Sequence, residues 1–397
     1  MLTPTTETEA ADIIRDHAAS RSPLAIRGGG TRAGFGNAVT AESVLSAAAL
    51  SGITAYNPAE MVITAHAGTP VAEIEAALAE NGQGMAFEPM DHRGLMGTSG
   101  TPTIGGLFAV NSSGPRRFTA GAARDHLLGI RFVNGEGEAV KAGGRVMKNV
   151  TGLDLVKLLA GSYGTLGFLT EVTFKVLPVP KTALTLVVSG LDDEEAVRLL
   201  ASAMSLSVEV SGAAHLPESV RGRVIGGVLP EGAATVLRLE GLEASVAVRA
   251  DKLTSALAGF GSISRLDAEQ TKALWREIRD VTPYADGTTR PLWRVSMAPS
   301  EAHKLVAGLR LRAGIDAFYD WQGGLIWMRM EADPEAEVLR HGVRTLGGGH
   351  AALLRASPAV RAATPAFEPQ TSAVALLSAR VRAKLDPHGI FNPELMA

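Results

Sequence analysis

Short apolar runs separated by glycine-rich interruptions make up the first half of the chain. Apolar runs bounded by turn residues predict strands, and the last run alternates apolar and polar residues as a half-buried strand does. The predicted strands cover residues 24–26, 61–65, 130–134 and 168–177. One helix is predicted between the second and third strands, because Val71, Ile74 and Leu78 share one face of a segment that Pro70 opens and Gly82 ends.

The second half has a different rhythm, in which strand and helix patterns alternate. It begins after residues 177–180, where two prolines two residues apart mark a boundary. Strands are predicted at residues 184–188, 236–239, 292–297, 325–330 and 351–354. Helices are predicted at residues 192–204, 243–257, 300–312, 334–345 and 374–385. This order predicts two β-α-β pairs in one antiparallel sheet with helices on one face, so the fold class is α+β.

Length and composition limit the possible classes of protein. A chain of 397 residues fits about two domains, taking roughly 150 residues per domain. Hydrophobic residues make up 46% and charged residues 20%, which indicates a globular protein rather than a disordered one. The net charge of −3 gives no long-range positive field for nucleic acid or anionic lipid, so neither is expected as a partner.

The absence of cysteine excludes several kinds of site. Disulfides, thiolate-bound zinc, iron–sulfur clusters and cysteine nucleophiles all need that side chain. Any iron–sulfur cluster that takes electrons from this protein would therefore belong to a partner. The N-terminus lacks a basic flank and an apolar run, and no stretch of about 18 apolar residues occurs. We expect a cytoplasmic protein without a membrane span, with any membrane contact peripheral and made through partners.

Gly28, Gly29 and Gly30 follow the first predicted strand. Gly28-x-Gly30-x-x-Ala33 matches the relaxed dinucleotide fingerprint, but a Rossmann fold needs a helix to begin at these glycines. Residues 31–37 have no helical periodicity. We favour a loop whose consecutive N–H groups form a nest for an anion such as a diphosphate. A plain glycine-rich turn is the alternative.

Two further glycine-rich segments occur, at residues 103–129 and 144–172. In this order the three segments resemble the FAD-binding domain of the vanillyl-alcohol-oxidase and p-cresol methylhydroxylase superfamily. The resemblance implies that the first segment wraps the diphosphate and that the second lies along the diphosphate and isoalloxazine. It implies that the third leads into a strand beside the adenosine. Residues 389–393 resemble the motif with which such chains return to the flavin.

The resemblance also implies the domain division and the FAD contacts. Residues 1–180 would form a two-part FAD-binding domain, residues 181–370 an α+β cap or substrate domain, and residues 371–397 a segment returning to the FAD domain. The implied FAD contacts are Arg27, Gly28, Gly29, Gly30, Thr31, Pro89, Ile104, Gly105, Gly106, Asn111, Gly114, Arg124, Asp125, Gly161, Ser162, Thr165, Gly167, Leu169 and Asn392.

Four details resemble one family within this superfamily, the FAD-binding subunits of glycolate oxidase. They are the segments 114–117, 146–150 and 348–351, and Tyr163, where relatives with their own catalytic histidines usually carry glutamate. The resemblance is close over residues 21–180, good over the tail and patchy over residues 181–370. Residues 27–37 lack the histidine to which some relatives attach flavin, so non-covalent FAD is expected. The histidine cluster of the self-sufficient dehydrogenases is absent, so no metal site is expected.

Oxidation of a 2-hydroxy acid needs a cation for the carboxylate, a base for the hydroxyl proton and a hydride path to flavin N5. His350, after three glycines, is the candidate base, and a structural histidine at a strand start is the alternative. Arg294, within a predicted strand, is the candidate cation, and it could instead face solvent. His92 follows Pro89 and is a further histidine that could lie near the flavin.

The leading hypothesis is an FAD-binding subunit of a glycolate (2-hydroxy acid) oxidase or dehydrogenase that works with a second FAD subunit and an iron–sulfur subunit. One alternative is a self-sufficient FAD-linked oxidase of D-lactate or a related 2-hydroxy acid. The other is a non-catalytic flavin subunit that relays electrons. Docking of a partner is expected at residues of the types that concentrate interface energy. The candidates are Arg116, Arg117, Trp293, Trp321 and Trp327. A core or interface position is the alternative for Trp321 and Trp327, and a solvated surface position is the alternative for the two arginines.

Overall fold

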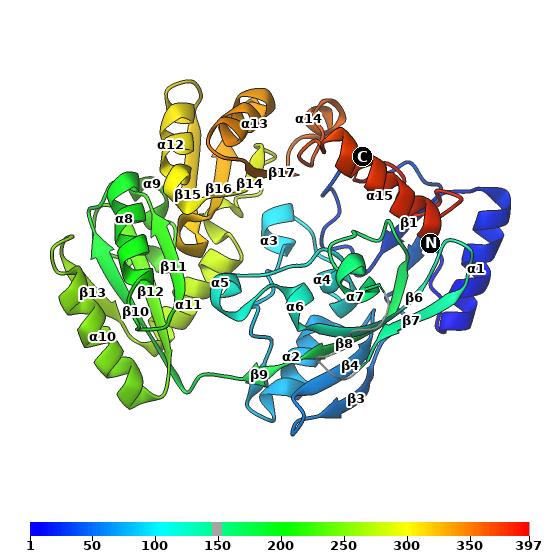
Figure 1. Cartoon of the computed structure of the whole chain (residues 1–397), viewed down its shortest axis with the longest axis horizontal. Helices are drawn as coiled ribbons and strands as arrows, with labels where there is room; N and C mark the ends of the chain where they lie inside the picture. Colours follow the sequence, from blue (N-terminus) through cyan, green and yellow to red (C-terminus); the bar gives the residue numbers. More distant parts are fainter. Residues whose placement is uncertain (145–152, 397) are drawn as a thin grey trace.

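The computed structural model describes residues 1–144 and 153–396, which form two regions lying side by side (Figure 1). The N-terminal region, residues 1–178 with the C-terminal segment 372–396, contains a five-stranded sheet. The other region, residues 182–355, contains an eight-stranded sheet and is called the cap below. The chain passes from one to the other after β9 (Leu177–Pro178), within the predicted boundary segment.

The five-stranded sheet of the N-terminal region has the order β3-β4-β8-β6-β7, and its neighbouring strands are antiparallel. A separate parallel pair, β1 with β2, carries the glycine loop at its end. The strands are β1 (Leu24–Arg27), β2 (Ser43–Ser46), β3 (Ile53–Asn57), β4 (Val62–His66), β5 (Gln83–Gly84), β6 (Leu127–Val133), β7 (Ala139–Gly143) and β8 (Phe168–Lys175). The helices are α1 (Glu7–Ser20), α2 (Val71–Ala79), α3 (Arg93–Met96), α4 (Ile104–Ala109), α5 (Arg117–Ala120), α6 (Ala123–His126) and α7 (Leu155–Leu159).

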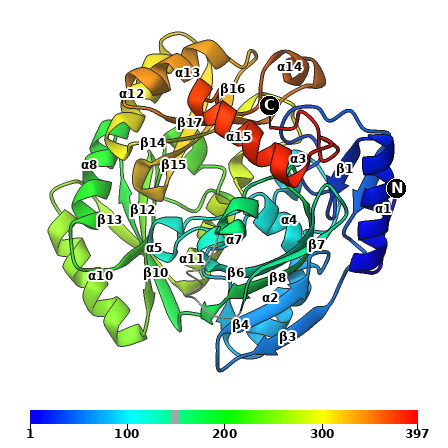
Figure 2. The same cartoon turned by 45° about the vertical axis from the view of Figure 1, so that its right-hand side comes forward.

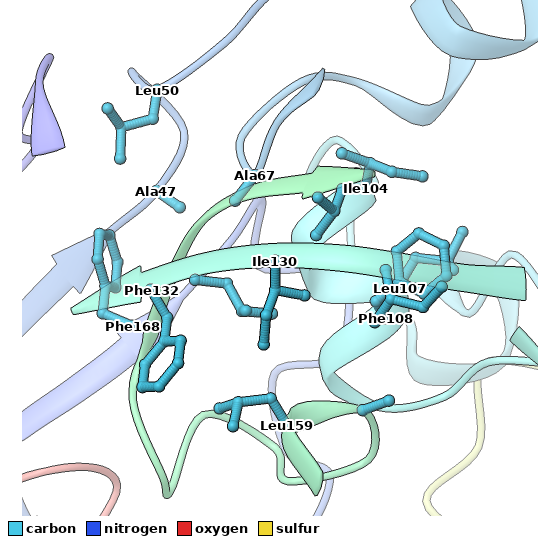
Figure 3. Close-up of a cluster of buried hydrophobic side chains, with 14 of the residues drawn as sticks. Ala47, Leu50, Ala67, Ile104, Leu107, Phe108, Ile130, Phe132, Leu159 and Phe168 are labelled. Atoms are coloured by element: carbon cyan, nitrogen blue, oxygen red, sulfur yellow. The ribbon is translucent and has the colours of Figure 1, made fainter. Parts of the chain in front are cut away.

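The core of the N-terminal region lies where β6 and β8 meet α4 and α7 (Figure 3). Ile104 and Phe108 of α4, Phe132 of β6 and Phe168 of β8 are completely buried. Burial of each such side chain contributes roughly 1.5–3 kcal/mol. This packing fixes the positions of α4 and the start of β8, both of which line the cavity described below.

The cap sheet has the order β13-β10-β12-β11-β15-β16-β14-β17. Its strands are β10 (Thr182–Ser189), β11 (Val210–Leu216), β12 (Ala234–Gly241), β13 (Ile263–Leu266), β14 (Leu292–Met297), β15 (Ile315–Asp320), β16 (Leu325–Met330) and β17 (Gly349–Arg355). Its helices are α8 (Asp193–Met204), α9 (Glu218–Arg221), α10 (Glu243–Leu257), α11 (Ala268–Arg279), α12 (Pro299–Arg310) and α13 (Ala336–Thr345). Short 3₁₀ turns occur at Ile225–Gly227, Thr282–Tyr284 and Trp321–Gly323.

The two faces of the cap sheet have different partners. Leu186 and Val188 of β10 pack with α8 and α10, whereas Val187, between them, packs on the opposite face with α11. The face that carries α11 is turned toward the N-terminal region, and Met90 and Leu95 of that region join its hydrophobic cluster (Figure 1). The antiparallel sheet and the helices on its outer face were predicted, but α11 on the inner face was not.

All predicted strands and helices are present, with boundaries shifted by a few residues. The strands β11, β13 and β15 and the helix α11 of the cap were not predicted. The strand β11 (VSGAAHL) contains glycine and alanine, which are poor strand formers, and β13 is a short edge strand. The helix α11 did carry a signal, since Asp267 and Gln270 form a capping box before an apolar stripe of Leu274, Trp275 and Ile278.

After the cap, the chain returns to the N-terminal region through α14 (Pro358–Ala363) and α15 (Ser372–Leu385). Figure 2 shows α15 running back from α14 across the N-terminal region. Val381 and Leu385 at the end of α15 pack against the core of that region. No helix in the described ranges combines the length and apolar character needed to cross a membrane.

Candidate functional site

A cavity of about 470 Å³ lies in the N-terminal region beside the parallel pair β1–β2. Its wall is formed by the end of β1 with the glycine loop, by the first turn of α4, and by the turn that leads into β8. Much of this wall is backbone, because glycines occur in all three segments. A backbone wall presents N–H groups to a ligand at close range, which suits an anionic group such as a diphosphate.

Gly29 shows why the loop needs glycine. A Cβ atom at this position would lie 1.6 Å from the carbonyl oxygen of Thr101, so any side chain would collide with backbone. The loop is therefore pressed against residues 100–101 on one side and open to the cavity on the other. Residues 31–34 form a turn and no helix begins at Gly30, which excludes the Rossmann interpretation.

The first turn of α4 approaches the cavity for a similar reason. A Cβ atom on Gly105 would lie 2.6 Å from the Cβ of Ala67, so glycine allows α4 to pack directly on the end of β4. Thr103 caps the helix by accepting a hydrogen bond from the Gly106 N–H. The start of the second glycine-rich segment is thus a capped helical turn that places Gly105 and Gly106 in the cavity wall.

The cavity brings together most of the predicted FAD contacts. Those that line it are Arg27, Gly28, Gly29, Gly30, Thr31, Gly105, Gly106, Ser162, Gly167, Leu169 and Asn392. Those outside its wall are Pro89, Ile104, Asn111, Gly114, Arg124, Asp125, Gly161 and Thr165. Several of the second group support the wall. Ile104 is a core residue, the Thr165 hydroxyl donates to the carbonyl oxygen of Ser162, and the Asn111 side chain accepts from the Arg124 N–H. The segment 146–150 lies outside the described residues.

Asn392 connects the returning C-terminus to two parts of the cavity wall. Its Oδ1 accepts a hydrogen bond of 2.7 Å from the N–H of Ile26, and its Nδ2 donates one of 2.8 Å to the carbonyl oxygen of Tyr163. The residue therefore fixes β1 relative to the turn before β8. The predicted closing motif has this structural role, and Asn392 also lines the cavity.

An aromatic group in which the sequence analysis missed all members except Tyr163 lies at the cavity. Phe35, Tyr163 and Phe367 form a group of three rings with centroids 5.3 to 5.6 Å apart. Phe35 and Tyr163 line the cavity, whereas Phe367 comes from the segment after α14. Arg361 of α14 donates to the carbonyl oxygen of Gly36 and also lines the cavity. Nothing local in the sequence indicates that these distant segments meet.

Several non-glycine residues around the site have a left-handed backbone. The φ angles of Glu88, Asn111, Tyr163 and Trp321 lie between 48° and 55°. Such conformations cost on the order of 1–3 kcal/mol each and persist where surrounding contacts determine them. At Tyr163 these contacts include a hydrogen bond from its N–H to the carbonyl oxygen of Ala109.

Three arginines, one in the cavity wall and two at the interface between the regions, have no carboxylate partner. Arg32 lines the cavity, Arg294 extends from β14 of the cap, and Arg117 begins α5. Among the described residues, none of these three guanidinium groups has a hydrogen-bond or ion-pair partner, and the Nε of Arg32 is enclosed without one. Burial lowers the pKa of Arg32 and of Arg294 to about 10, and the nearby Tyr163 opposes this shift in both. Uncompensated positive charge of this kind suits an anionic ligand.

Trp321 joins two of these arginines across the interface between the regions. The guanidinium carbons of Arg117 and Arg294 lie 4.5 and 4.9 Å from the centre of its indole ring. The Trp321 Nε1–H donates a hydrogen bond of 3.0 Å to the carbonyl oxygen of Gly114. This contact holds the backbone of the second glycine-rich segment against the cap.

The prediction that the three tryptophans belong to a docking surface is wrong. Trp293, Trp321 and Trp327 are 0%, 7% and 4% exposed, because they belong to the cap core and the interface between the two regions. Arg116 is also engaged internally, since its guanidinium forms an ion pair with Glu240 and its N–H donates to Glu88.

A charged cluster ties the cap to the N-terminal region next to Trp321. Arg238 of β12 donates two hydrogen bonds of 2.9 Å to the two carboxylate oxygens of Glu88. Asp320, which is 2% exposed, lies nearby, and its Oδ1 accepts from the N–H of Trp321. Burial raises the pKa of the Asp320 carboxyl to about 7, and Arg238 and Arg294 oppose this shift.

The two candidate histidines lie in different surroundings. His350 is exposed on β17, paired with Ser296, and it shares a sheet face with Arg294, because residues two apart on a strand point to the same side. His92 is half-buried at the start of α3, and its Nδ1 lies 3.1 Å from the carbonyl oxygen of Met90. Burial and the charge of Arg32 hold the pKa of His92 well below the usual value. No group of acidic and histidine side chains in the described part of the chain is arranged to hold a metal ion.

Comparison with known proteins yields one family model and several relatives. The model described as FAD binding domain matches residues 1–143. The glycolate oxidase subunit GlcE of Escherichia coli strain K12 is 32% identical over 377 residues, which cover 95% of this chain and 93% of the relative. The glycolate oxidase subunit GlcD of Bacillus subtilis strain 168 is 30% identical over 187 residues, covering 47% of this chain and 38% of the relative.

The solved structure of p-cresol methylhydroxylase with substrate bound superposes on the whole chain. It covers 99% of this chain and 88% of its own, with a TM-score of 0.71 and 14% identity. This similarity confirms the predicted α+β fold of an FAD-binding domain combined with a cap. At such low identity it shows the fold alone.

Proposed function

Since the chain belongs to the family of the glycolate oxidase subunit GlcE, we propose that it is the FAD-binding subunit of a glycolate oxidase, an FAD-dependent 2-hydroxy acid oxidoreductase. The observation that carries this proposal is the backbone-lined cavity, in which eleven of the predicted FAD contacts meet. Arg32 in its wall and Arg294 next to Tyr163 supply positive charge for the carboxylate that such a substrate carries. When bound, FAD accepts the hydride that leaves the substrate carbon.

The residues of the cavity fit FAD without a covalent bond. The glycine loop exposes consecutive N–H groups for the diphosphate, and the described residues of the wall include no histidine or cysteine for attachment. We expect the purified protein to be yellow and to release its flavin on acid precipitation. Flavin that stays with the precipitated polypeptide would contradict non-covalent binding. A colourless protein that does not take up added FAD would contradict the proposed cofactor.

Arg294 is the proposed cation for the substrate carboxylate. It extends from the cap without a carboxylate partner and lies beside Tyr163, which lines the cavity. Replacing a charged hydrogen bond costs about 1.5–3 kcal/mol, which corresponds to roughly a 10- to 100-fold loss of kcat/KM. The variant Arg294→Met should show this loss with glycolate and keep its FAD content. Arg312→Met, at an exposed position beyond α12, is the matched control and should behave as the unchanged protein.

The proposed partners are a second FAD subunit and an iron–sulfur subunit. The name of the relative GlcE marks it as one subunit of an enzyme, and this chain has no cysteine with which to hold a cluster. Glycolate-dependent dye reduction should therefore rise when the chain is mixed with these partners. Rapid turnover by the isolated chain, unchanged on mixing, would favour a self-sufficient oxidase. The cytoplasmic location remains a prediction that cell fractionation tests.

A further inference from the structure

The proposed reaction needs a group that takes the hydroxyl proton of the substrate, and burial raises the pKa of Tyr163 in the cavity wall, which makes its phenol a poor base. The segment around His92 offers such a group. It follows Pro89 in the N-terminal region and is anchored from both sides. The N–H of Met90 donates to the Ser112 hydroxyl, and the N–H of Asp91 donates to Asp280, at the end of α11 in the cap. These contacts hold His92 at the junction of the two regions.

The local hydrogen bond determines which ring nitrogen of His92 can act as a base. Its Nδ1 lies 3.1 Å from the carbonyl oxygen of Met90, and a carbonyl oxygen only accepts. In the neutral ring Nδ1 therefore carries the hydrogen, and Nε2 carries the lone pair. Among the described residues, Nε2 has no hydrogen-bond partner. The histidine is thus held with an acceptor nitrogen available.

The charges around His92 come from the groups that would hold a carboxylate. Arg32 and Arg294 both act on it electrostatically, and Asp91 partly opposes them. Burial and the two arginines lower the pKa of His92 well below 6.5, so the ring is neutral at physiological pH. A carboxylate bound by these arginines would neutralise their charge and make protonation of the ring easier. The base is therefore kept unprotonated until a substrate arrives.

We propose that His92 is the catalytic base, that its Nε2 takes the hydroxyl proton of the 2-hydroxy acid, and that Arg32 and Arg294 together hold the carboxylate. This inference rests on the proposed function. The O–H bond breaks and its electron pair forms the C=O bond, while the Cα hydrogen leaves as a hydride. The substrate loses two electrons and two protons in total and becomes a 2-oxo acid. Bound FAD would supply the hydride acceptor, His92 gains the proton, and the ring later releases it to solvent.

The test is anaerobic reduction of the flavin by glycolate in the FAD-loaded protein, assembled with its partner subunits and followed by stopped-flow absorbance. His92→Gln keeps a side-chain N–H for the carbonyl oxygen of Met90 but removes the base. General-base catalysis contributes about 10²- to 10⁴-fold, so the rate should fall by about this factor. FAD content and the binding of oxalate, measured from the flavin difference spectrum, should stay near those of the unchanged protein. His341→Gln, at an exposed position on α13, is the matched control.

The pH profile separates a base from a structural residue. In the unchanged protein the rate should fall on acidification at a pH below about 6.5, the ordinary histidine pKa, because His92 then becomes protonated. This acid limb should disappear in His92→Gln. The variant His92→Ala supplies a second readout, since added imidazole should restore part of its rate. Lack of rescue together with lost oxalate binding would indicate a structural role and overturn the proposal.

Failure of the inference can be distinguished from failure of the proposed function. If glycolate reduces the flavin of the unchanged protein and His92→Gln equally fast, only the assignment of His92 is wrong. If His350→Gln instead loses the rate and the acid limb, His350 is the base. If glycolate does not reduce the flavin of the unchanged protein, alone or with its partners, the proposed function fails and His92 has no such role.

Discussion

The cavity wall of the N-terminal region and the facing surface of the cap contribute to the site in different ways. The cavity wall is formed largely by backbone, as at Gly29, where no side chain fits. The cap contributes side chains such as Arg294 and Trp321, which extend from a regular sheet and the turn beside it. A backbone wall requires glycine at particular positions and therefore leaves a pattern in the sequence. A side-chain surface only requires that strands pair in the right order, and this leaves no local pattern.

The same difference separates two kinds of sensitivity to mutation. A side chain at a backbone contact displaces main chain, so the ligand site and the local fold are lost together. Replacing a side chain on the cap sheet leaves the sheet intact and changes only charge or contact. We therefore expect the largest effects in the glycine loop, smaller ones at the contacts between the regions, and the smallest at single buried groups of the cap.

The largest effect is expected for Gly29→Ala. Its Cβ would lie 1.6 Å from the carbonyl oxygen of Thr101, so the loop must move away from residues 100–101. We expect complete loss of FAD, measured as the ratio of flavin to protein absorbance, while the cap stays folded by limited proteolysis. The control Gly222→Ala adds a methyl group in the cap where no atom lies within 4 Å, and it should retain full FAD. Full FAD content in Gly29→Ala would show that the loop is only a turn.

An intermediate effect is expected at the ion pair between Glu88 and Arg238. The Arg238 side chain is 4% exposed, and Glu88→Ala leaves it with Glu240, whose carboxylate lies 3.3 Å away. Breaking a buried ion pair costs about 3–5 kcal/mol of stability. Because Arg238 keeps Glu240 as a partner, we expect a loss at the lower end of this range, about 3 kcal/mol. Urea unfolding measures this loss. Asp12→Ala removes an exposed pair with Arg15 and should leave the midpoint unchanged. A similar midpoint for both variants would mean that the cross-region pair adds no stability.

The smallest effect is expected for Asp320→Asn, and it should depend on pH. The carboxyl has a pKa of about 7 in the folded protein against 3.8 otherwise, so the folded state keeps its proton to higher pH. Stability is therefore lost as pH rises from about 4 to about 7 and is not regained above this range. The variant lacks this titration and retains an oxygen for the Trp321 N–H. Its gain in stability over the unchanged protein should be larger at pH 8.5 than at pH 5, by on the order of 2 kcal/mol.

Thermal unfolding at the two pH values measures this difference. The control Asp333→Asn, at an exposed position in the cap, should show the same shift at both. An Asp320→Asn gain that is equal at pH 5 and pH 8.5 would indicate a packing effect. That result would show that ionisation of the buried Asp320 carboxyl does not reduce stability, and the expected pH-dependent effect in the cap would be wrong.

The sequence predicted the helices and strands of both regions better than it predicted which of them lie next to each other. Apolar runs placed β10, β14 and β16, and strand and helix patterns that alternate along the chain placed α10 and α12, because these signals are local. The strand β11 was missed because packing on both faces, and not a strand-forming composition, holds it in the centre of the sheet. The division at residues 180 and 370 stays a prediction, although the chain does pass between the two sheets at the predicted proline pair.

By itself, the sequence determined the glycine-rich wall, since only glycine permits the backbone contacts made by Gly29 and Gly105. It also determined the absence of thiolate chemistry, which follows from composition. Only the tertiary structure decided that Arg32 and Arg294 act electrostatically on His92, and that Trp321 is an internal contact and not a docking residue. The physical reason is the distance along the chain over which each interaction acts. Backbone conformation and side-chain size act between near neighbours, whereas charge pairing and burial depend on which distant segments the folded sheets bring together.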